Sequence, residues 1–221
     1  MDLIFHAFSI GLILSIMPGP VFFVLIENSI TKGIRSALAL DLGVLLSDVV
    51  YILLAVFFVE QINALLTGEN KQLFDIIGGA IFIVYGVLNW FKKAKITTGN
   101  EELAEVSEKF HLSESKDPKK NLGLSIAKGF LLNFANPLVI FYWLSVASVA
   151  KRESTDDSNS MLFLFLGLIL LTFFSFDVLK IITAKRIKNF VTEKLLNLLN
   201  KVIGVLFVAF GLFFMFRFML H

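Results

Sequence analysis

Residues 3–26 read LIFHAFSIGLILSIMPGPVFFVLI, an apolar stretch that is interrupted by Pro18-Gly19-Pro20. At ~1.5 Å of rise per helical residue, the stretch is long enough to cross the ~30 Å hydrocarbon core of a bilayer. Proline lacks a backbone N–H and disrupts the interior of a helix. The motif therefore predicts a membrane helix that is broken partway along its length.

This break leaves backbone carbonyl groups without their usual helical partners. Pro18 cannot donate to the carbonyl of Leu14, and Pro20 cannot donate to that of Ile16. In hydrocarbon each such group is costly unless protein, water or a ligand bonds it, so broken helices occur mainly where they line a cavity. The motif predicts a transporter with its site near residues 14–20, and a kink used only for packing is the alternative.

The composition indicates an integral membrane protein. Hydrophobic residues make up 57% of the 221 positions, and Phe alone supplies 25 of them. Charged residues fall to 17%, against about 25% in soluble proteins. The chain has no cysteine, which excludes disulfides, thiolate metal sites and dithiol redox chemistry. We expect no cofactor and no nucleic-acid partner.

Six apolar segments are each long enough to span a bilayer. The sequence therefore predicts an all-α membrane protein with six transmembrane helices, and its first segment is expected to be retained rather than cleaved as a signal peptide. The segments are residues 3–28, 36–59, 73–91, 124–149, 161–183 and 200–219.

The basic residues predict the orientation of these helices. When the loops are assigned alternately to two sides, sixteen of the 20 Lys and Arg residues fall on one side. Lys and Arg concentrate in cytoplasmic loops. We expect a multi-pass protein of the bacterial cytoplasmic (inner) membrane, with both termini outside and loop 92–123 in the cytoplasm.

That loop contains apolar residues at helical spacing, Leu103, Val106 and Phe110, among several glutamates. One interpretation is a short amphipathic helix at the membrane surface, which would be placed to act as a gate. The preferred interpretation is a solvated linker with one or two helical turns.

The two halves of the chain repeat each other in three places. Residues 79–86 (GAIFIVYG) align with 204–211 (GVLFVAFG), and the motif at 17–20 corresponds to Asn-Pro-Leu at 136–138. The second and fifth segments each carry one deep aspartate. Because each half has three helices, the second half must enter the membrane inverted. The predicted organisation is a first three-helix repeat at 1–91, a linker at 92–123 and an inverted repeat at 124–221, with helices 1 and 4 broken at proline. Secondary transporters are often built this way.

The second break supplies further candidate site residues. Pro137 cannot donate to the carbonyl of Asn133, and Asn136 lies beside it. Freed carbonyls suit an ammonium group or a cation, and the exposed N–H groups at the start of a half-helix suit a carboxylate. An amino acid carries both groups, although other zwitterions also fit. A proline kink needed only for packing is the alternative.

Three of the aspartates within the apolar segments are candidate site residues: Asp41, Asp48 and Asp177. Asp48 is near the membrane centre, where a charge costs at least ~2.5 kcal/mol, so it is a candidate for carrying a proton or binding a cation or a substrate amine. The alternative is a protonated acid that makes one structural hydrogen bond. Asp41 is shallower and is expected to face the cytoplasmic vestibule. Asp177 has Lys180 one turn away, so a local ion pair competes with a role in transport.

Other polar residues give weaker signals. Tyr51, Trp90, Tyr142 and Trp143 are interpreted as anchors at the membrane interface. The histidines are scattered, and no nucleophile has a paired base. No phosphate-binding glycine loop is present, so neither an enzyme nor an ATP-driven pump is predicted.

These motifs together resemble the lysine exporter (LysE) family, which includes homoserine/threonine and neutral amino-acid exporters. The resemblance covers nearly the whole chain and rests on Pro18-Gly19-Pro20, KGIR at 32–35, Gly43, Ser47-Asp48 and GFLLNFANP at 129–137. It implies efflux of an amino acid or a relative, driven by a proton or sodium gradient, often by a homodimer. A metal-ion exporter of the same superfamily is the alternative, with Asp41, Asp48 and Asp177 as hard ligands within the membrane.

Overall fold

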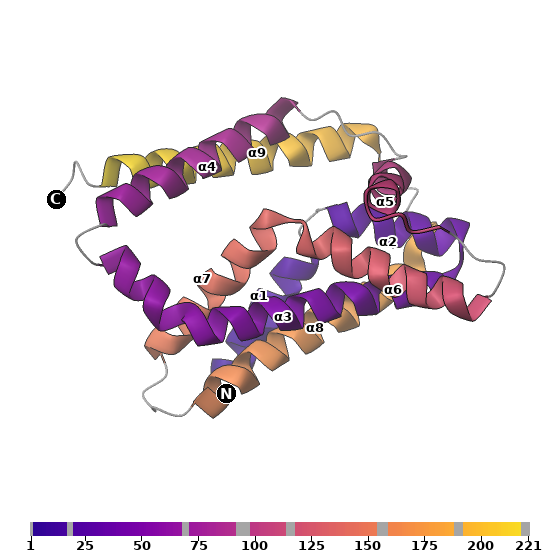
Figure 1. Cartoon of the computed structure of the whole chain (residues 1–221), viewed down its shortest axis with the longest axis horizontal. Coiled ribbons are helices and arrows are strands. Elements are labelled where there is room, and N and C mark those ends of the chain that lie inside the picture. Colours follow the sequence, from indigo (N-terminus) through magenta and orange to yellow (C-terminus); the bar gives the residue numbers. More distant parts are fainter. Residues whose placement is uncertain are drawn as a thin grey trace. The chain divides into compact units, whose positions relative to one another are not determined.

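The computed structural model describes residues 2–16, 20–67, 71–91, 98–113, 118–153, 159–187 and 192–217 (Figure 1). Every regular element in these ranges is an α-helix, which confirms the all-α prediction. The helices are α1 (Asp2–Ile16), α2 (Pro20–Thr31), α3 (Ile34–Thr67), α4 (Lys71–Phe91), α5 (Thr98–Lys109), α6 (Pro118–Phe134), α7 (Pro137–Glu153), α8 (Asn159–Ile187) and α9 (Glu193–Arg217).

Three of the described helices are long and apolar enough to cross a membrane unaided: Ile34–Phe58, Ser160–Arg186 and Glu193–Phe216. The pair Asn121–Phe134 and Val139–Ser148 is bent by 69° and would make a fourth, broken span. Leu3–Ser15, Val21–Thr31 and Asp75–Phe91 are shorter apolar helices. The chain is thus built from several membrane-compatible helices, and the count of six spans stays a prediction.

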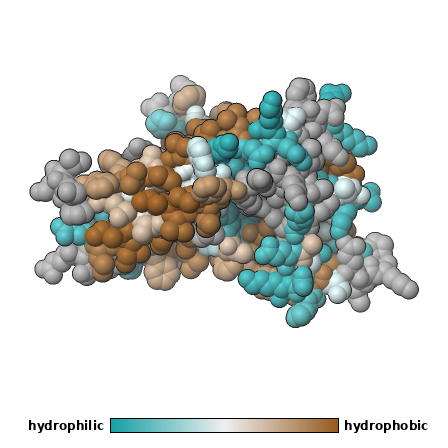
Figure 2. Space-filling model, turned by 90° about the horizontal axis from the view of Figure 1, so that it is seen from above, coloured by the Kyte–Doolittle hydropathy of each residue, from teal (hydrophilic) through white to brown (hydrophobic). Residues whose placement is uncertain are grey.

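Large apolar side chains lie on the outside of these helices, among them Phe57, Val84, Phe91 and Phe213. Figure 2 shows apolar residues over much of the visible face. A soluble monomer rarely exposes continuous apolar surface on this scale. Lipid tails, in contrast, are a favourable environment for such a surface.

The helices form two compact units, and the first comprises Met1–Phe57 and Thr97–Phe190. It contains α1, α2, most of α3 and α5 to α8, so it combines helices from both halves of the sequence. Its core joins five of these helices through Val24, Leu25, Ala37, Leu40, Val44, Leu103, Leu132 and Ile181.

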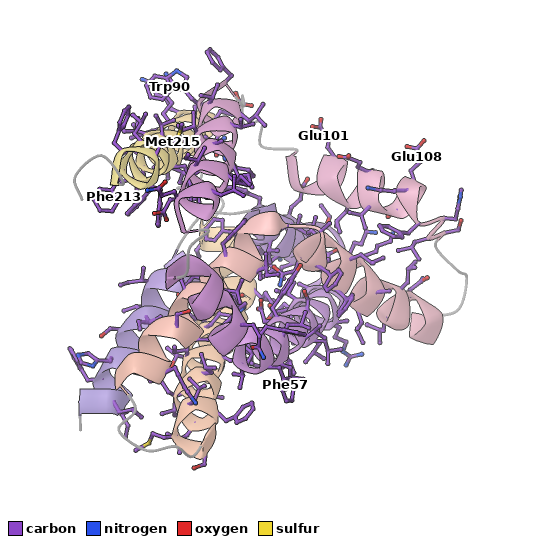
Figure 3. The ribbon with its side chains drawn as sticks, turned by 60° about the vertical axis from the view of Figure 1, so that its left-hand side comes forward. Phe57, Trp90, Glu101, Glu108, Phe213 and Met215 are labelled. Atoms are coloured by element: carbon purple, nitrogen blue, oxygen red, sulfur yellow. The ribbon has the colours of Figure 1, made fainter. Side chains whose placement is uncertain are left out.

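Helix α5 belongs to the first unit and carries the apolar residues noted in the loop. Leu103 is buried in the core and Val106 packs against it, whereas Phe110 lies beyond the end of the helix and is exposed. Figure 3 shows Glu101 and Glu108 on the side of α5 that points away from α6. The segment therefore has a packed face and a charged outer face, instead of the fully solvated linker that we preferred from the sequence.

The second unit, Phe58–Ile96 and Val191–His221, is built on α4 packed against α9. The two helices run antiparallel, because Gly79 meets Gly211 and Gly86 meets Gly204. A Cβ added at Gly79 would lie 2.7 Å from the Gly211 carbonyl oxygen, and one added at Gly204 would lie 2.7 Å from that of Gly86. Glycine at these positions lets the two backbones touch. Phe82 also stacks on Phe207, with ring centroids 5.6 Å apart.

Each glycine contacts the glycine that is aligned with the other member of its own helix's pair. The alignment pairs Gly79 with Gly204 and Gly86 with Gly211, whereas the structure places Gly79 on Gly211 and Gly86 on Gly204. Exchanging the two halves therefore maps each contact onto the other. A two-fold axis between equivalent elements produces this pattern.

Gly79→Ala is expected to destabilise the α4–α9 pair, because the new methyl group would lie 2.6 Å from Met215 Cγ as well as against the Gly211 carbonyl. Overpacking of this kind costs about 1–3 kcal/mol. The control is Gly78→Ala, where nothing lies within 4 Å and alanine gains up to about 1 kcal/mol in helix propensity. Thermal unfolding of both purified variants in detergent provides the measurement, and equal stability would contradict the close contact.

Candidate functional site

Asp48 lies at the centre of a buried polar cluster in the first unit. Its side chain is only 3% exposed on the apolar helix α3. Its Oδ1 accepts one hydrogen bond from Asn133 Nδ2 of α6 at 2.9 Å and another from Trp143 Nε1 of α7 at 3.0 Å. Two donors from two other helices thus hold one carboxyl oxygen in a fixed direction.

The boundary between α6 and α7 positions both donors. Asn133 lies in the last turn of α6, and Pro137, which lacks a backbone N–H, is the first residue of α7. The bend that follows places Asn133 and Trp143 on the same carboxyl oxygen. Trp143 is 1% exposed, so our prediction that it anchors the membrane interface was wrong. Only its place within an apolar segment, away from both ends, distinguished it from Trp90, which is 45% exposed.

The backbone carbonyl groups at this boundary have hydrogen-bond partners other than those we predicted. The carbonyl of Asn133, which we expected to be free, accepts a hydrogen bond from the backbone N–H of Asn136 at 3.1 Å. This bond joins residues three apart instead of the usual four, a tighter turn that is common at helix ends. The carbonyl that takes a side-chain donor is that of Phe134, which accepts from Tyr51 Oη at 2.6 Å.

Tyr51 follows Asp48 by three residues on α3 and is buried, so it too is not an interface anchor. Its ring stacks on Phe134, with centroids 5.2 Å apart, which positions the hydroxyl over the carbonyl. Tyr142 is a further correction: its hydroxyl is buried and makes no hydrogen bond to any described residue.

A second buried cluster surrounds Asp177 of α8. Asp177 forms the local ion pair with Lys180 that the sequence offered beside a role in transport. Lys180 Nζ also donates to the backbone carbonyl of Ser15, near the end of α1, at 2.6 Å. The ammonium group lies 5.1 Å from the centroid of the Phe22 ring, within range of a cation–π interaction.

Asp41 completes this second cluster. We expected it to face the cytoplasmic vestibule, but it is buried beside Asp177 because α8 brings that carboxyl group against it. Its Oδ2 makes no hydrogen bond to a described residue. With both acids ionised and Lys180 charged, the cluster carries a net charge of −1.

The two clusters correspond to each other. In each, a residue three positions after the deep aspartate, Tyr51 or Lys180, donates to a backbone carbonyl in the last turn of another helix. The recipients are Phe134, the last residue of α6, and Ser15, the penultimate residue of α1. The ends of α6 and α1 therefore each receive a side-chain donor, from α3 and α8 respectively.

The remaining predicted site residues belong to the Pro-Gly-Pro region of the chain, except Asn136. Leu14 is half-buried in the last turn of α1, Ile16 ends α1 and Pro20 begins α2. Pro18 and Gly19 lie outside the described residues. Asn136 lies between α6 and α7, where its carbonyl accepts from the N–H of Val139 at 3.1 Å.

The buried carboxyl groups of these clusters can bind a ligand through hydrogen bonds and charge. Asp48 offers acceptor positions to a donor such as an ammonium group, and the second cluster can take up a positive charge. Within the described ranges, no three His, Cys, Asp or Glu side chains are arranged to hold a metal ion.

Buried carboxyl groups enclosed by apolar helices are typical of membrane transport proteins. The chain belongs to the family described as "LysE type translocator", which it matches over residues 12–217. It is 30% identical over 207 residues to the protein named "Putative amino acid efflux protein YcgF" of Bacillus subtilis (strain 168), a match that covers 93% of this chain and 91% of that protein. No solved structure matches the chain significantly. The family resemblance seen in the motifs is thereby confirmed.

Tyr51→Phe is expected to destabilise the protein by about 1–3 kcal/mol, because it removes the donor to the buried Phe134 carbonyl while keeping the ring stack. The control is Tyr85→Phe in α4, the same change in the other unit, where the edge contact of the ring with Phe207 is retained. Thermal unfolding of the purified variants provides the comparison. A Tyr51→Phe protein as stable as the control would show that this carbonyl needs no side-chain donor.

Proposed function

We propose that this chain is a secondary-active exporter that moves an amino acid or a close derivative across the cytoplasmic membrane by alternating access. The observation that carries the proposal is the buried Asp48 carboxyl group, held by Asn133 and Trp143 where α6 gives way to α7. The family and the name of the Bacillus relative support an amino acid as substrate. Both termini lie outside, as the distribution of Lys and Arg predicts.

Asp48 binds the substrate ammonium group in this proposal. An ionised carboxylate has about four acceptor positions, and the bonds from Asn133 and Trp143 use two of them. These two donors orient the carboxylate before the substrate arrives, which lowers the entropy cost of binding. The buried hydroxyl of Tyr142 supplies a further polar group on α7.

The cluster of Asp41, Asp177 and Lys180 binds the coupling ion. One proton or one sodium ion would bring its net charge from −1 to zero, which favours uptake of a single positive charge within the membrane. Asp41 Oδ2, buried and without a hydrogen-bond partner among the described residues, offers the acceptor position.

The architecture is proposed to be two inverted three-helix repeats. The reciprocal glycine contacts of α4 and α9 support it. A second reciprocity occurs in the first unit, where a Cβ at Gly11 would meet the carbonyl of Ile169 and one at Gly129 would meet that of Leu40. Leu40 precedes Asp48 by eight residues, and Ile169 precedes Asp177 by eight, so the two carbonyls occupy equivalent positions in the two halves. Rocking of such repeats around a shared site is how transporters of this design alternate access.

Asp48→Asn is expected to reduce efflux at least ~10-fold, because a charge-assisted bond to the ammonium group is lost while the shape of the side chain is kept. The measurement is efflux from proteoliposomes preloaded with a panel of labelled amino acids. Asp75→Asn in α4 is the matched control, since Asp75 is also buried but belongs to the other unit. Normal gradient-driven efflux by a well-folded Asp48→Asn protein would reject the proposed site.

Asp41→Asn is expected to abolish uphill, gradient-driven efflux while leaving downhill exchange of substrate in place, because it removes a charge from the ion site and not from Asp48. The assay is run once with a proton gradient alone and once with a sodium gradient alone, which identifies the coupling ion. Asp75→Asn again serves as control. Full gradient-driven efflux by Asp41→Asn would assign coupling to other residues.

A further inference from the structure

A pocket of about 350 Å³ lies in the first unit, between α2, α3, α5 and α6. Three basic residues line it: Lys32 from the turn between α2 and α3, Arg35 from α3 and Lys128 from α6. None of the described lining residues is acidic. Helix α5 contributes Leu103, while its labelled glutamates point outward (Figure 3).

Polar side chains join the walls of this pocket. Asn28 Nδ2 donates to Ser36 Oγ at 3.3 Å, and Ser36 Oγ lies 3.3 Å from Ser125 Oγ. All three residues line the pocket. The two ammonium groups and the guanidinium group are the charge-assisted donors that suit a carboxylate.

The pocket lies on the same two helices as the proposed substrate site. Lys128 is five residues before Asn133 on α6, about 7.5 Å along the helix axis, and Leu40 lines the pocket eight residues before Asp48 on α3. Between them the backbones of α3 and α6 touch, with Gly43 against Ile126 and Gly129 against Leu40. This crossing separates the pocket from Asp48.

We infer that the basic pocket is an access site that binds the carboxylate of the substrate before it reaches Asp48, and that the substrate is a neutral or acidic amino acid. This inference rests on the proposed function. Three positive charges attract a carboxylate and repel the side chain of a cationic amino acid such as lysine or arginine. The volume falls within the ~300–1,000 Å³ of small-molecule sites.

The test is transport kinetics of the purified protein in phosphatidylcholine vesicles, with the twenty common L-amino acids as a labelled panel. For the substrate that wild type transports fastest, the Arg35→Gln/Lys128→Gln variant is expected to show a KM raised ~10-fold or more with a nearly unchanged maximal rate. Transport of lysine relative to that substrate is expected to rise. Lys109→Gln, an exposed change on α5, should alter neither quantity, and Arg35→Lys/Lys128→Arg should restore KM and verify folding.

The outcomes separate the two proposals. If folded wild type transports no amino acid, the proposed function fails and this inference fails with it. If wild type transports one but the double variant keeps its KM, or if lysine or arginine is the fastest substrate, only this inference fails. It also fails if KM is unchanged in phosphatidylcholine while added phosphatidylglycerol stimulates wild type and not the double variant, because the pocket then binds an anionic lipid headgroup.

Discussion

A backbone carbonyl at the end of a helix inside a membrane must find a donor, and two such contacts organise the polar interior of the first unit. Water is scarce in hydrocarbon, so the donor must come from the protein. Tyr51 supplies it to Phe134, and Lys180 supplies it to Ser15. Each donor lies one turn beyond a deep aspartate. The groups that stabilise these helix ends and the groups proposed to bind substrate and ion are therefore parts of the same two helices, α3 and α8.

Acidic and basic side chains of the first unit differ in their burial. The carboxyl groups of Asp41, Asp48 and Asp177 are buried among apolar helices, whereas the basic residues Lys32 and Arg35 are exposed at the rim of the pocket. A zwitterion that passes from the pocket to Asp48 would meet the complement of its carboxylate first and the complement of its ammonium group second. Each charged group of the substrate would thus meet one complementary site along this route, which lowers the cost of bringing charge into the apolar region.

Much of this structure could be predicted from the sequence because hydropathy and proline act locally. Apolar runs indicated the helices, Pro137 marked the start of α7, and the position of Asp48 within an apolar run is matched by its burial. The partners of Asp48 were not predicted, since Trp143 is 95 residues away and no local pattern shows which helix it faces. The same reason explains the errors at Tyr51 and at Asp41, where contact with α6 or α8 reversed the interpretation. Position along a helix can be read from sequence, but direction around its axis depends on distant neighbours.

The reciprocal contact of α4 and α9 makes the two halves of the chain depend on each other at four glycines. Each half contributes two glycines, and each glycine touches a glycine of the opposite half. A larger residue at any one of the four positions would damage a contact made by both halves. If the chain arose by duplication, its halves were free to diverge at lipid-facing positions but remained mutually constrained here, so ancestral similarity should persist longest in residues 79–86 and 204–211.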